Sequence, residues 1–92
     1  MALNTLELKF NNACNLIKIY PKTIENKDLL YLYGMYKQAT VGNCNIKEPS
    51  SYDLKQHAKW NEWNNNNGVT KTVAMAFYIS RVDELYTKLN IK

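Results

Sequence analysis

Aromatic and basic side chains in the middle of the chain have the spacing of a ligand-binding surface. Tyr33, Tyr36 and Lys37 follow one another at i, i+3 and i+4, so a helix would place them on one face. Two rings and an ammonium group on one face suit a planar ligand that carries phosphate. Lys55 and Lys59 repeat the i, i+4 spacing further along and would add positive charge from a neighbouring helix.

The same residue types also have a plainer interpretation. Tyrosines such as Tyr33, Tyr36 and Tyr78 often pack half-buried in a core, and lysines such as Lys18 and Lys37 are usually solvated. Only the joint spacing of rings and cations favours ligand binding over this interpretation.

Catalysis has little support in the sequence. His57 is the only histidine, and a Gly-x-Ser-x-Gly elbow, a phosphate-cradling glycine loop and a metal-ligand cluster are all missing. Cys14 and Cys44 lie far apart without C-x-x-C spacing, so half-buried thiols are expected rather than a disulfide or a nucleophile. We expect a protein that is not an enzyme, with no catalytic residue, no metal and no cofactor.

Bulk properties indicate one folded domain covering residues 1–92. Hydrophobic residues make up 46% of the chain and charged residues 22%, with a formal net charge of +4, which favours anionic partners. Apolar stretches are far shorter than the roughly 20 residues that cross a bilayer, and the start does not resemble an export signal. A cytoplasmic protein without a transmembrane segment is therefore expected.

Apolar residues at steps of three and four predict an all-α fold. The first helix is expected over 5–20, stopping before Pro21. The second should begin at an N-cap Asn26, carry Asp28 in its first turn and end just before Gly42. The expected buried stripes are Phe10, Ala13, Cys14, Ile17 and Tyr20, and then Leu29, Leu32, Tyr33, Tyr36 and Ala39.

A polar loop over 43–51 should precede the third helix. Ser50, with Asp53 three residues on, resembles a capping box, and Ser51 is a competing cap. The helix should then run to about Asn64. Its apolar residues are Leu54, Ala58, Trp60 and Trp63, and the tryptophans are expected to be core anchors.

The run Asn64–Asn67 before Gly68 is interpreted as a solvated connection with a turn. Thr70 is the expected N-cap of a fourth helix that reaches almost to the C-terminus. Its stripe is Ala74, Met75, Tyr78, Ile79, Val82, Leu85 and Leu89. These elements predict a small four-helix bundle of antiparallel type. Gly34, inside the second helix, is either tolerated there or allows something to approach closely.

Three segments resemble the acyl-CoA-binding protein family. LYGMYKQATVG at 32–42 is similar to the motif Y-x-x-Y/F-K-Q-A-T-x-G. DLKQHAKWNEW at 53–63 is similar to D-x-K-x-x-A-K-W-x-A-W, and AMAFYISRVDEL at 74–85 to A-M-x-x-Y-I-x-x-V-x-x-L. The segments follow one another at the family spacing, and the resemblance spans nearly the whole chain.

The resemblance implies a monomeric four-helix bundle that binds, pools and transports long-chain fatty acyl-CoA esters in the cytoplasm without catalysis. It implies transient contact with the enzymes that use acyl-CoA, and no nucleic acid as partner. By position, Tyr36 would stack on adenine, and Tyr33, Lys37 and Lys59 would hold the region of the ribose 3′-phosphate. Lys18, Lys55 and Tyr78 would complete the site, and Gly34 and Met35 lie in the segment that would line it.

Several positions depart from the family pattern. Glu48-Pro49-Ser50 stands where Arg-Pro-Gly is common, and His57 stands where lysine is frequent. Thr-Lys-Thr-Val at 70–73 replaces an acidic start of the fourth helix, and Pro21 comes earlier than the usual proline. The predicted CoA residues are all retained.

Two other functions fit the same rings and lysines. A small basic helical module that binds single-stranded nucleic acid would use them for stacking and phosphate contacts. A protein-interaction bundle would use exposed aromatic side chains against a partner helix.

Overall fold

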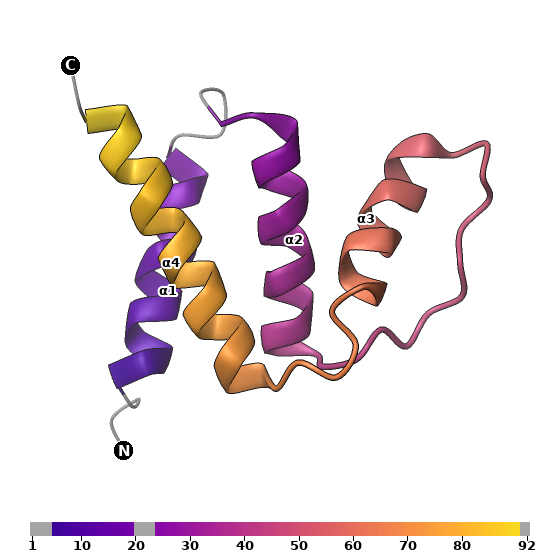
Figure 1. The fold of residues 1–92 in the computed structure, drawn as a ribbon, viewed down its shortest axis with the longest axis horizontal. Helices are drawn as coiled ribbons and strands as arrows, with labels where there is room; N and C mark the ends of the chain where they lie inside the picture. The colour runs from indigo at the N-terminus through magenta and orange to yellow at the C-terminus, as the bar shows by residue number, and fades with distance from the viewer. Residues whose placement is uncertain (1–4, 20–23, 91–92) are drawn as a thin grey trace.

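Four helices make up the part of the chain that the computed structural model describes, residues 5–19 and 24–90 (Figure 1). They are α1 (Thr5–Ile19), α2 (Asn26–Thr40), α3 (Leu54–Asn64) and α4 (Lys71–Asn90). The described residues form no strand, so the predicted all-α class is confirmed. The predicted helix end at Tyr20 and Pro21, and the side chain of Leu89, lie outside what is described.

The helices run in the order up, down, down, up. Figure 1 shows α2 antiparallel to α1 and α4, whereas α3 runs parallel to α2. The connection over 41–53 causes this arrangement, because it passes to the outer side of α3 and returns there to the level at which α2 began before α3 starts. The prediction of an antiparallel-type bundle is therefore wrong for the α2–α3 pair, since a long crossover permits parallel neighbours.

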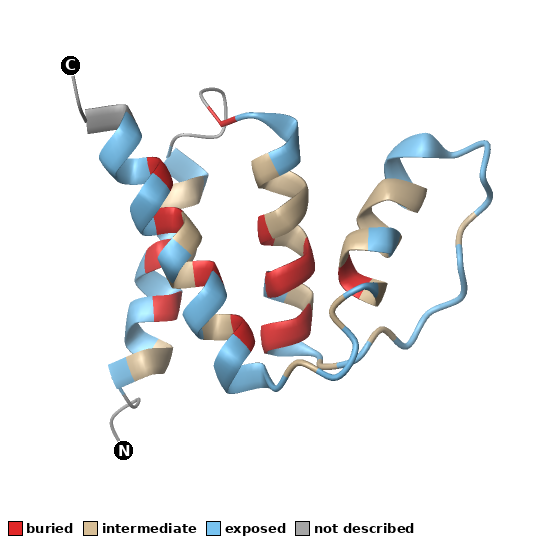
Figure 2. Ribbon diagram, in the orientation of Figure 1, coloured by how far each residue is buried: buried red, intermediate tan, exposed pale blue. Residues whose placement is uncertain are grey.

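The core lies where α1, α2 and α4 meet, and α3 packs against α2 at one side. The molecule is flat, with principal extents of 38 × 37 × 18 Å. Figure 2 shows buried residues on the inner faces of the helices. The core cluster comprises Phe10, Ala13, Ile24, Leu32, Met35, Ala39, Ala74, Tyr78, Val82 and Leu85.

The stripe predicted for α2 is partly wrong. Leu32 and Ala39 are buried as expected, but Tyr36 is 43% exposed. Met35 and Gln38 are buried although the prediction omitted them. The reason is that α2 lies between α3 and α4, so it buries two faces rather than one.

The predicted caps of α2 and α3 are also wrong. Glu25, not Asn26, occupies the N-cap of α2, with extended backbone and no side-chain cap bond. Neither Ser50 nor Ser51 caps α3, because Asp53 accepts the amide of Gln56 at 3.2 Å. A carboxylate at that place satisfies a free N–H and suits the helix dipole.

The predicted start of α4 and the predicted end of α2 agree with the structure. Thr70 Oγ1 accepts the amide of Val73 at 3.2 Å and so caps α4. Gly42 follows α2 with φ +105°, a conformation that glycine adopts without a Cβ clash. Leu54, one of the apolar residues expected on the third helix, is 77% exposed at the start of α3.

The asparagine run is more than a solvated connection. Asn67 Oδ1 accepts the backbone amide of Cys44 at 2.9 Å. Asn43 Oδ1 accepts the amide of Gly68 at 2.8 Å and the Gln38 side-chain amide at 3.0 Å. These bonds tie the chain that follows α3 to the end of α2 and to the residues just after it, which corrects the prediction.

Gly34 lies directly under the backbone of α3. A Cβ at this position would lie 2.8 Å from the backbone carbonyl oxygen of Glu62 and 2.9 Å from the side-chain nitrogen Nδ2 of Asn66. Trp63, 2% exposed, fastens the same contact by donating its indole N–H to the Gly42 carbonyl at 2.7 Å. Of the two explanations for Gly34, close approach is the one that the structure supports.

Gly34→Ala should therefore destabilise the fold by about 1–3 kcal/mol, because a backbone carbonyl must move. In an open helix the same change would stabilise by roughly 1 kcal/mol. Urea denaturation followed by circular dichroism measures the difference. Ser80→Ala, on the exposed surface of α4, is the control and should change stability by about 0.5 kcal/mol or less. A Gly34→Ala protein more stable than the wild type would contradict the packing described.

Candidate ligand-binding site

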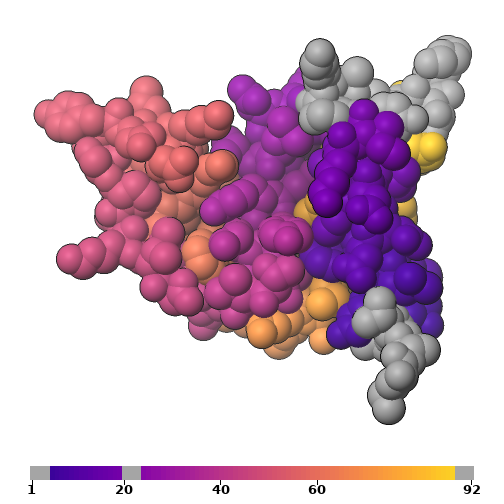
Figure 3. Space-filling model, turned by 180° about the vertical axis from the view of Figure 1, so that it is seen from behind, coloured from indigo at the N-terminus to yellow at the C-terminus, as the bar shows by residue number. Residues whose placement is uncertain are grey.

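A cavity of about 660 Å³ opens between the first halves of α2 and α3. This volume is within the usual range of small-molecule sites, about 300–1,000 Å³. Figure 3 shows the corresponding recess between α3 and α2, at the top of the view from behind. The cavity is lined by Asn26, Leu29, Leu30, Tyr33, Leu54, Lys55, Ala58 and Lys59. Its chemistry is that of an apolar trough with ammonium groups along one wall.

Two cations and two rings cross the boundary between α2 and α3. The Lys59 ammonium lies over the Tyr33 ring, 5.2 Å from its centroid. The Lys37 ammonium lies over the Trp63 ring at 4.8 Å. Each helix thus supplies one cation and one ring: Lys37 and Tyr33 come from α2, and Lys59 and Trp63 come from α3. The two members of each pair lie one turn apart on the same face of their helix. These contacts hold two predicted lysines beside the cavity.

A second group lies where α2 faces α1 and α4. The ring of Tyr36 stacks on that of Phe10, with centroids 6.0 Å apart and planes inclined by 20°. Tyr78 lies 6.5 Å from Tyr36 and 5.1 Å from Phe10. Tyr36 keeps 43% of its surface exposed, so this supported ring can still accept a stacking partner.

Tyr78 and Cys14 are the titratable groups whose pKa values this environment changes most clearly. Burial raises the pKa of the Tyr78 phenol far above its ordinary value of 10.0, with the neighbouring Cys14 and Tyr36 adding to the shift. Burial also raises the pKa of the Cys14 thiol, although a hydrogen bond from Tyr78 and the charge of Lys18 act in the opposite direction. Tyr78 is therefore a neutral donor and Cys14 a protonated thiol near pH 7.

The predicted site residues thus fall into three sets. Tyr33, Lys37, Lys55 and Lys59 meet along α2 and α3. Lys18, Tyr36 and Tyr78 belong to the group beside α1, Lys18 through its effect on Cys14. Gly34 packs under α3 and Met35 lies in the core, so both support the site from behind rather than line the cavity.

Five cavity residues were missed as site residues. Leu29 was assigned to a buried stripe, Asn26 to an N-cap, and Leu54 and Ala58 only to the third helix, whereas Leu30 was not considered. A signal for Leu30 was present in the sequence, because it is an apolar residue outside the stripe of its helix. The sequence contains no comparable indication for Leu54. Its place at the cavity depends on where the connection over 41–53 ends and α3 begins, which the sequence pattern does not specify.

Known proteins resemble this chain in both sequence and fold. The sequence profile of the family described as acyl-CoA binding protein matches residues 7–82. The Acyl-CoA-binding protein of Dictyostelium discoideum is 42% identical over 79 residues, covering 86% of this chain and 94% of that protein. The crystal structure of Oryza sativa Acyl-CoA-Binding Protein 2 superposes with a TM-score of 0.89 at 40% identity, covering 94% of both chains.

The chain belongs to the acyl-CoA-binding protein family. A further relative, the Acyl-CoA-binding domain-containing protein 6 homolog of Dictyostelium discoideum, is 55% identical over 62 residues. That match covers 67% of this chain but only 22% of the relative. The four helices of the acyl-CoA-binding protein fold, predicted from the motifs, are thereby confirmed.

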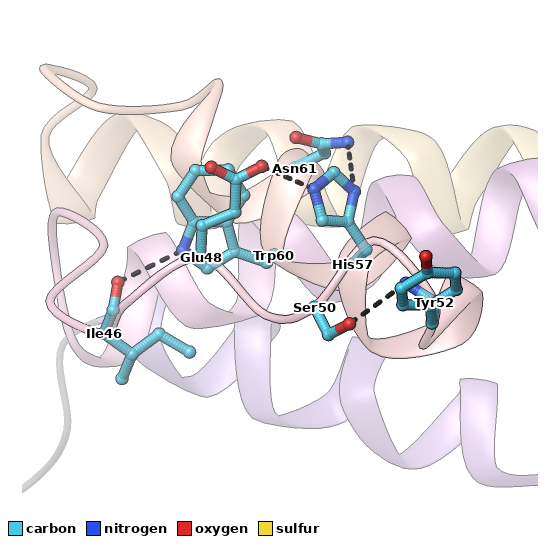
Figure 4. Close-up of polar contacts among 7 residues, drawn as sticks. All are labelled: Ile46, Glu48, Ser50, Tyr52, His57, Trp60 and Asn61. Atoms are coloured by element: carbon cyan, nitrogen blue, oxygen red, sulfur yellow. Dashed lines mark hydrogen bonds and ion pairs between the residues drawn. The ribbon is translucent and has the colours of Figure 1, made fainter.

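Two departures from the pattern of the acyl-CoA-binding protein family contact one another. His57 Nε2 lies 2.6 Å from the Glu48 carboxylate, and Asn61 donates to His57 Nδ1 at 3.2 Å (Figure 4). Because Nδ1 accepts, Nε2 carries the proton that faces Glu48. Trp60 adds a bond from its indole to the Ile46 carbonyl at 3.1 Å. The acid and the histidine therefore act together to hold the crossover against α3.

Within residues 5–19 and 24–90, no group of three or more histidine, cysteine, aspartate or glutamate side chains is arranged to hold a metal ion. No helix in this part of the chain has the length and apolar character needed to cross a bilayer.

The raised pKa values of Tyr78 and Cys14 predict a loss of stability in alkali. Above about pH 9–10 the unfolded chain releases these two protons while the folded chain keeps them, so the free energy of unfolding falls as pH rises. Tyr78→Phe should make this fall less steep in urea titrations between about pH 8 and 10.5. Tyr52→Phe, at a side chain 95% exposed, is the control and should keep the wild-type slope. Equal slopes in all three proteins would contradict the prediction.

Proposed function

We propose that this protein binds long-chain fatty acyl-CoA esters reversibly, and that it stores and carries them without catalysing a reaction. The observation that carries the proposal is the apolar cavity between α2 and α3 with lysines along one wall. Such a site suits a ligand with a long apolar part joined to an anionic part. Family membership supports the same ligand class.

The head group is proposed to bind along α2. Tyr36 would stack on adenine, because its ring is backed by Phe10 and open on the other side. Lys37 and Lys59 would hold phosphate, since their ammonium groups are already confined over rings. An ammonium over a ring keeps most of its capacity to donate hydrogen bonds, and phosphate is the stronger acceptor.

The acyl chain is proposed to enter the cavity past Leu29, Leu30 and Ala58. Each buried CH₂ contributes about 0.8 kcal/mol, so ten of them would supply on the order of 8 kcal/mol before ordering costs. The chain would thus provide most of the affinity, and the lysines would select the CoA ester over the free fatty acid. We further propose a cytoplasmic monomer that meets acyl-CoA-using enzymes only transiently.

Lys59→Ala and Lys37→Ala should each weaken binding of palmitoyl-CoA by about tenfold to a hundredfold, the value of a charge-assisted hydrogen bond. Titration calorimetry measures the affinity, and thermal unfolding should show a shift of only a few degrees. Lys88→Ala, on the exposed end of α4, is the matched control.

Two outcomes would overturn the head-group assignment. Palmitate binding as tightly as palmitoyl-CoA would show that the lysines do not select the ester. An equal loss of affinity in Lys88→Ala would show that general charge, rather than these positions, controls binding. Salt-sensitive binding of single-stranded oligonucleotides, without any response to acyl-CoA, would favour the nucleic-acid alternative.

Ala58→Phe tests the cavity separately from the head group. The larger ring would occupy space between α2 and α3, so the affinity for palmitoyl-CoA should fall about tenfold or more. Binding of CoA without an acyl chain should change little. Ala76→Phe, on the exposed face of α4, controls for the added apolar surface. If Ala58→Phe lowered the affinities for palmitoyl-CoA and for CoA equally, the proposed place of the acyl chain in this cavity would be wrong.

A further inference from the structure

Asn67 is the only asparagine in the sequence that a glycine follows. In an Asn-Gly pair the glycine nitrogen can attack the side-chain carbonyl carbon of the asparagine, because glycine has no Cβ that hinders the approach. Asparagine is one of the residue types that limit protein lifetime at elevated temperature. Asn67 and Gly68 are both exposed in the connection between α3 and α4, so water reaches them. This pair is therefore where the chemistry of the chain most favours spontaneous deamidation.

Deamidation proceeds through a cyclic imide. The Gly68 nitrogen loses its proton to hydroxide and bonds to Cγ of Asn67, while the Cγ–Nδ2 bond breaks. The leaving nitrogen takes a proton from water and departs as ammonia, which restores the hydroxide. Water then opens the ring at one of its two carbonyl carbons and gives aspartate or isoaspartate at position 67. An amide is thereby exchanged for a carboxylate, which lowers the formal net charge of +4 by one.

The structure engages both reacting groups in hydrogen bonds. Gly68 N–H, the nucleophile, donates to Asn43 Oδ1 at 2.8 Å. Asn67 Oδ1 accepts the backbone amide of Cys44 at 2.9 Å, and Asn67 Nδ2 donates to Asn64 Oδ1 at 3.2 Å. Together these bonds make up the 43–68 contact. Attack on Cγ requires the contact to open, because the nitrogen must lose its proton and the carboxamide must turn toward it.

The 43–68 contact lies at the margin of the molecule. Asn43, Asn67 and Gly68 are exposed, and marginal segments open at a lower free-energy cost than the whole fold. Behind them, the buried side chain of Gln38 donates to Asn43 Oδ1 at 3.0 Å and to the Val69 carbonyl at 2.8 Å. Its Oε1 has no hydrogen-bond partner among the described residues. Opening would let water reach this oxygen, which lowers the cost of opening further.

We propose that Asn67 is a site of spontaneous deamidation, that opening of the 43–68 contact controls its rate, and that Asn43 protects it. The site goes beyond the proposed function, because it does not depend on which ligand the cavity binds. Isoaspartate adds one carbon atom to the backbone at position 67 and moves the acceptor that the Cys44 amide uses. The contact then closes less well, so each reaction leaves the connection between α3 and α4 more loosely attached to the end of α2.

Timed incubation of the full chain at mildly alkaline pH tests the proposal. Peptide mass spectrometry measures aspartate and isoaspartate at position 67, in buffer and in urea that unfolds the chain. The wild type should form both products in buffer at a rate about tenfold lower than in urea, because only the open form reacts. Asn43→Ala should react about tenfold faster than the wild type in buffer, because Gly68 and Gln38 lose their acceptor. In urea the two chains should react alike.

Asn43→Asp is the matched control. Its carboxylate accepts the same two N–H groups, so it should react no faster than the wild type. Val82→Ala controls for global stability, because Val82 is buried in the core and takes no part in the contact, and its rate in buffer should match the wild-type rate. Asn64→Ala removes only the acceptor of Asn67 Nδ2 and should react about threefold faster than the wild type. This variant tests the contact if Asn43→Ala does not fold.

Several results would contradict the proposal. Equal wild-type rates in buffer and in urea would show that the contact protects nothing. Absence of both products in buffer would show that the folded protein has no such modification site. Equal rates for Asn43→Ala and Asn43→Asp would remove Asn43 as the protecting residue. An acceleration by Val82→Ala as large as that by Asn43→Ala would show that the reaction follows global unfolding instead.

Discussion

The direct packing of α3 on the backbone of α2 is the contact on which the candidate site depends. Gly34 has no side chain, so the Glu62 carbonyl approaches the α2 backbone closely. Trp63 then reaches over the end of α2 to the Gly42 carbonyl. A pair of helices at this separation keeps the lysine of each within reach of the ring of the other. Wider spacing would remove both contacts and open one wall of the cavity.

Electrostatics and burial divide the candidate site into two parts. Along α2 and α3, the ammonium groups of Lys37 and Lys59 lie over aromatic rings near the surface. Beside α1, burial keeps the Tyr78 phenol and the Cys14 thiol protonated, as their raised pKa values indicate. A charged ligand would therefore find its counter-ions on one side and neutral, ring-rich support on the other.

Local sequence signals predicted most of the fold. Helical periodicity predicted the four helices that the structure describes. Thr70 and Gly42 correctly predicted the start of α4 and the end of α2, because the effect of each depends only on the backbone next to it. The same rule failed at Asn26 and Ser50, where the chain enters the helix one or more residues away from the expected cap. Cap choice depends on the path of the preceding loop, and that path is fixed by distant contacts such as Trp60 with Ile46.

The candidate site was predictable in its composition rather than in its arrangement. Spacing on one helix placed Tyr33 and Lys37 together, and the motifs supplied Lys59 and Tyr78. The parallel course of α2 and α3 was not encoded in any periodicity, so Leu30 and Leu54 were missed as residues that line the cavity. The role of Asn67 was missed for a similar reason, because its partner at Cys44 is 23 residues away in the chain.

The flat shape has a consequence for motion. Because α3 is fastened to α2 and to no other helix to a comparable degree, it forms a small cooperative unit at the margin of the molecule. Such a unit can detach and return at a lower free-energy cost than global unfolding. Detachment of α3 would widen the cavity while the packing of α1 against α4 stayed intact. A long ligand would then enter from the side, through a hinge motion at the connection over 41–53, rather than end-first through a narrow opening.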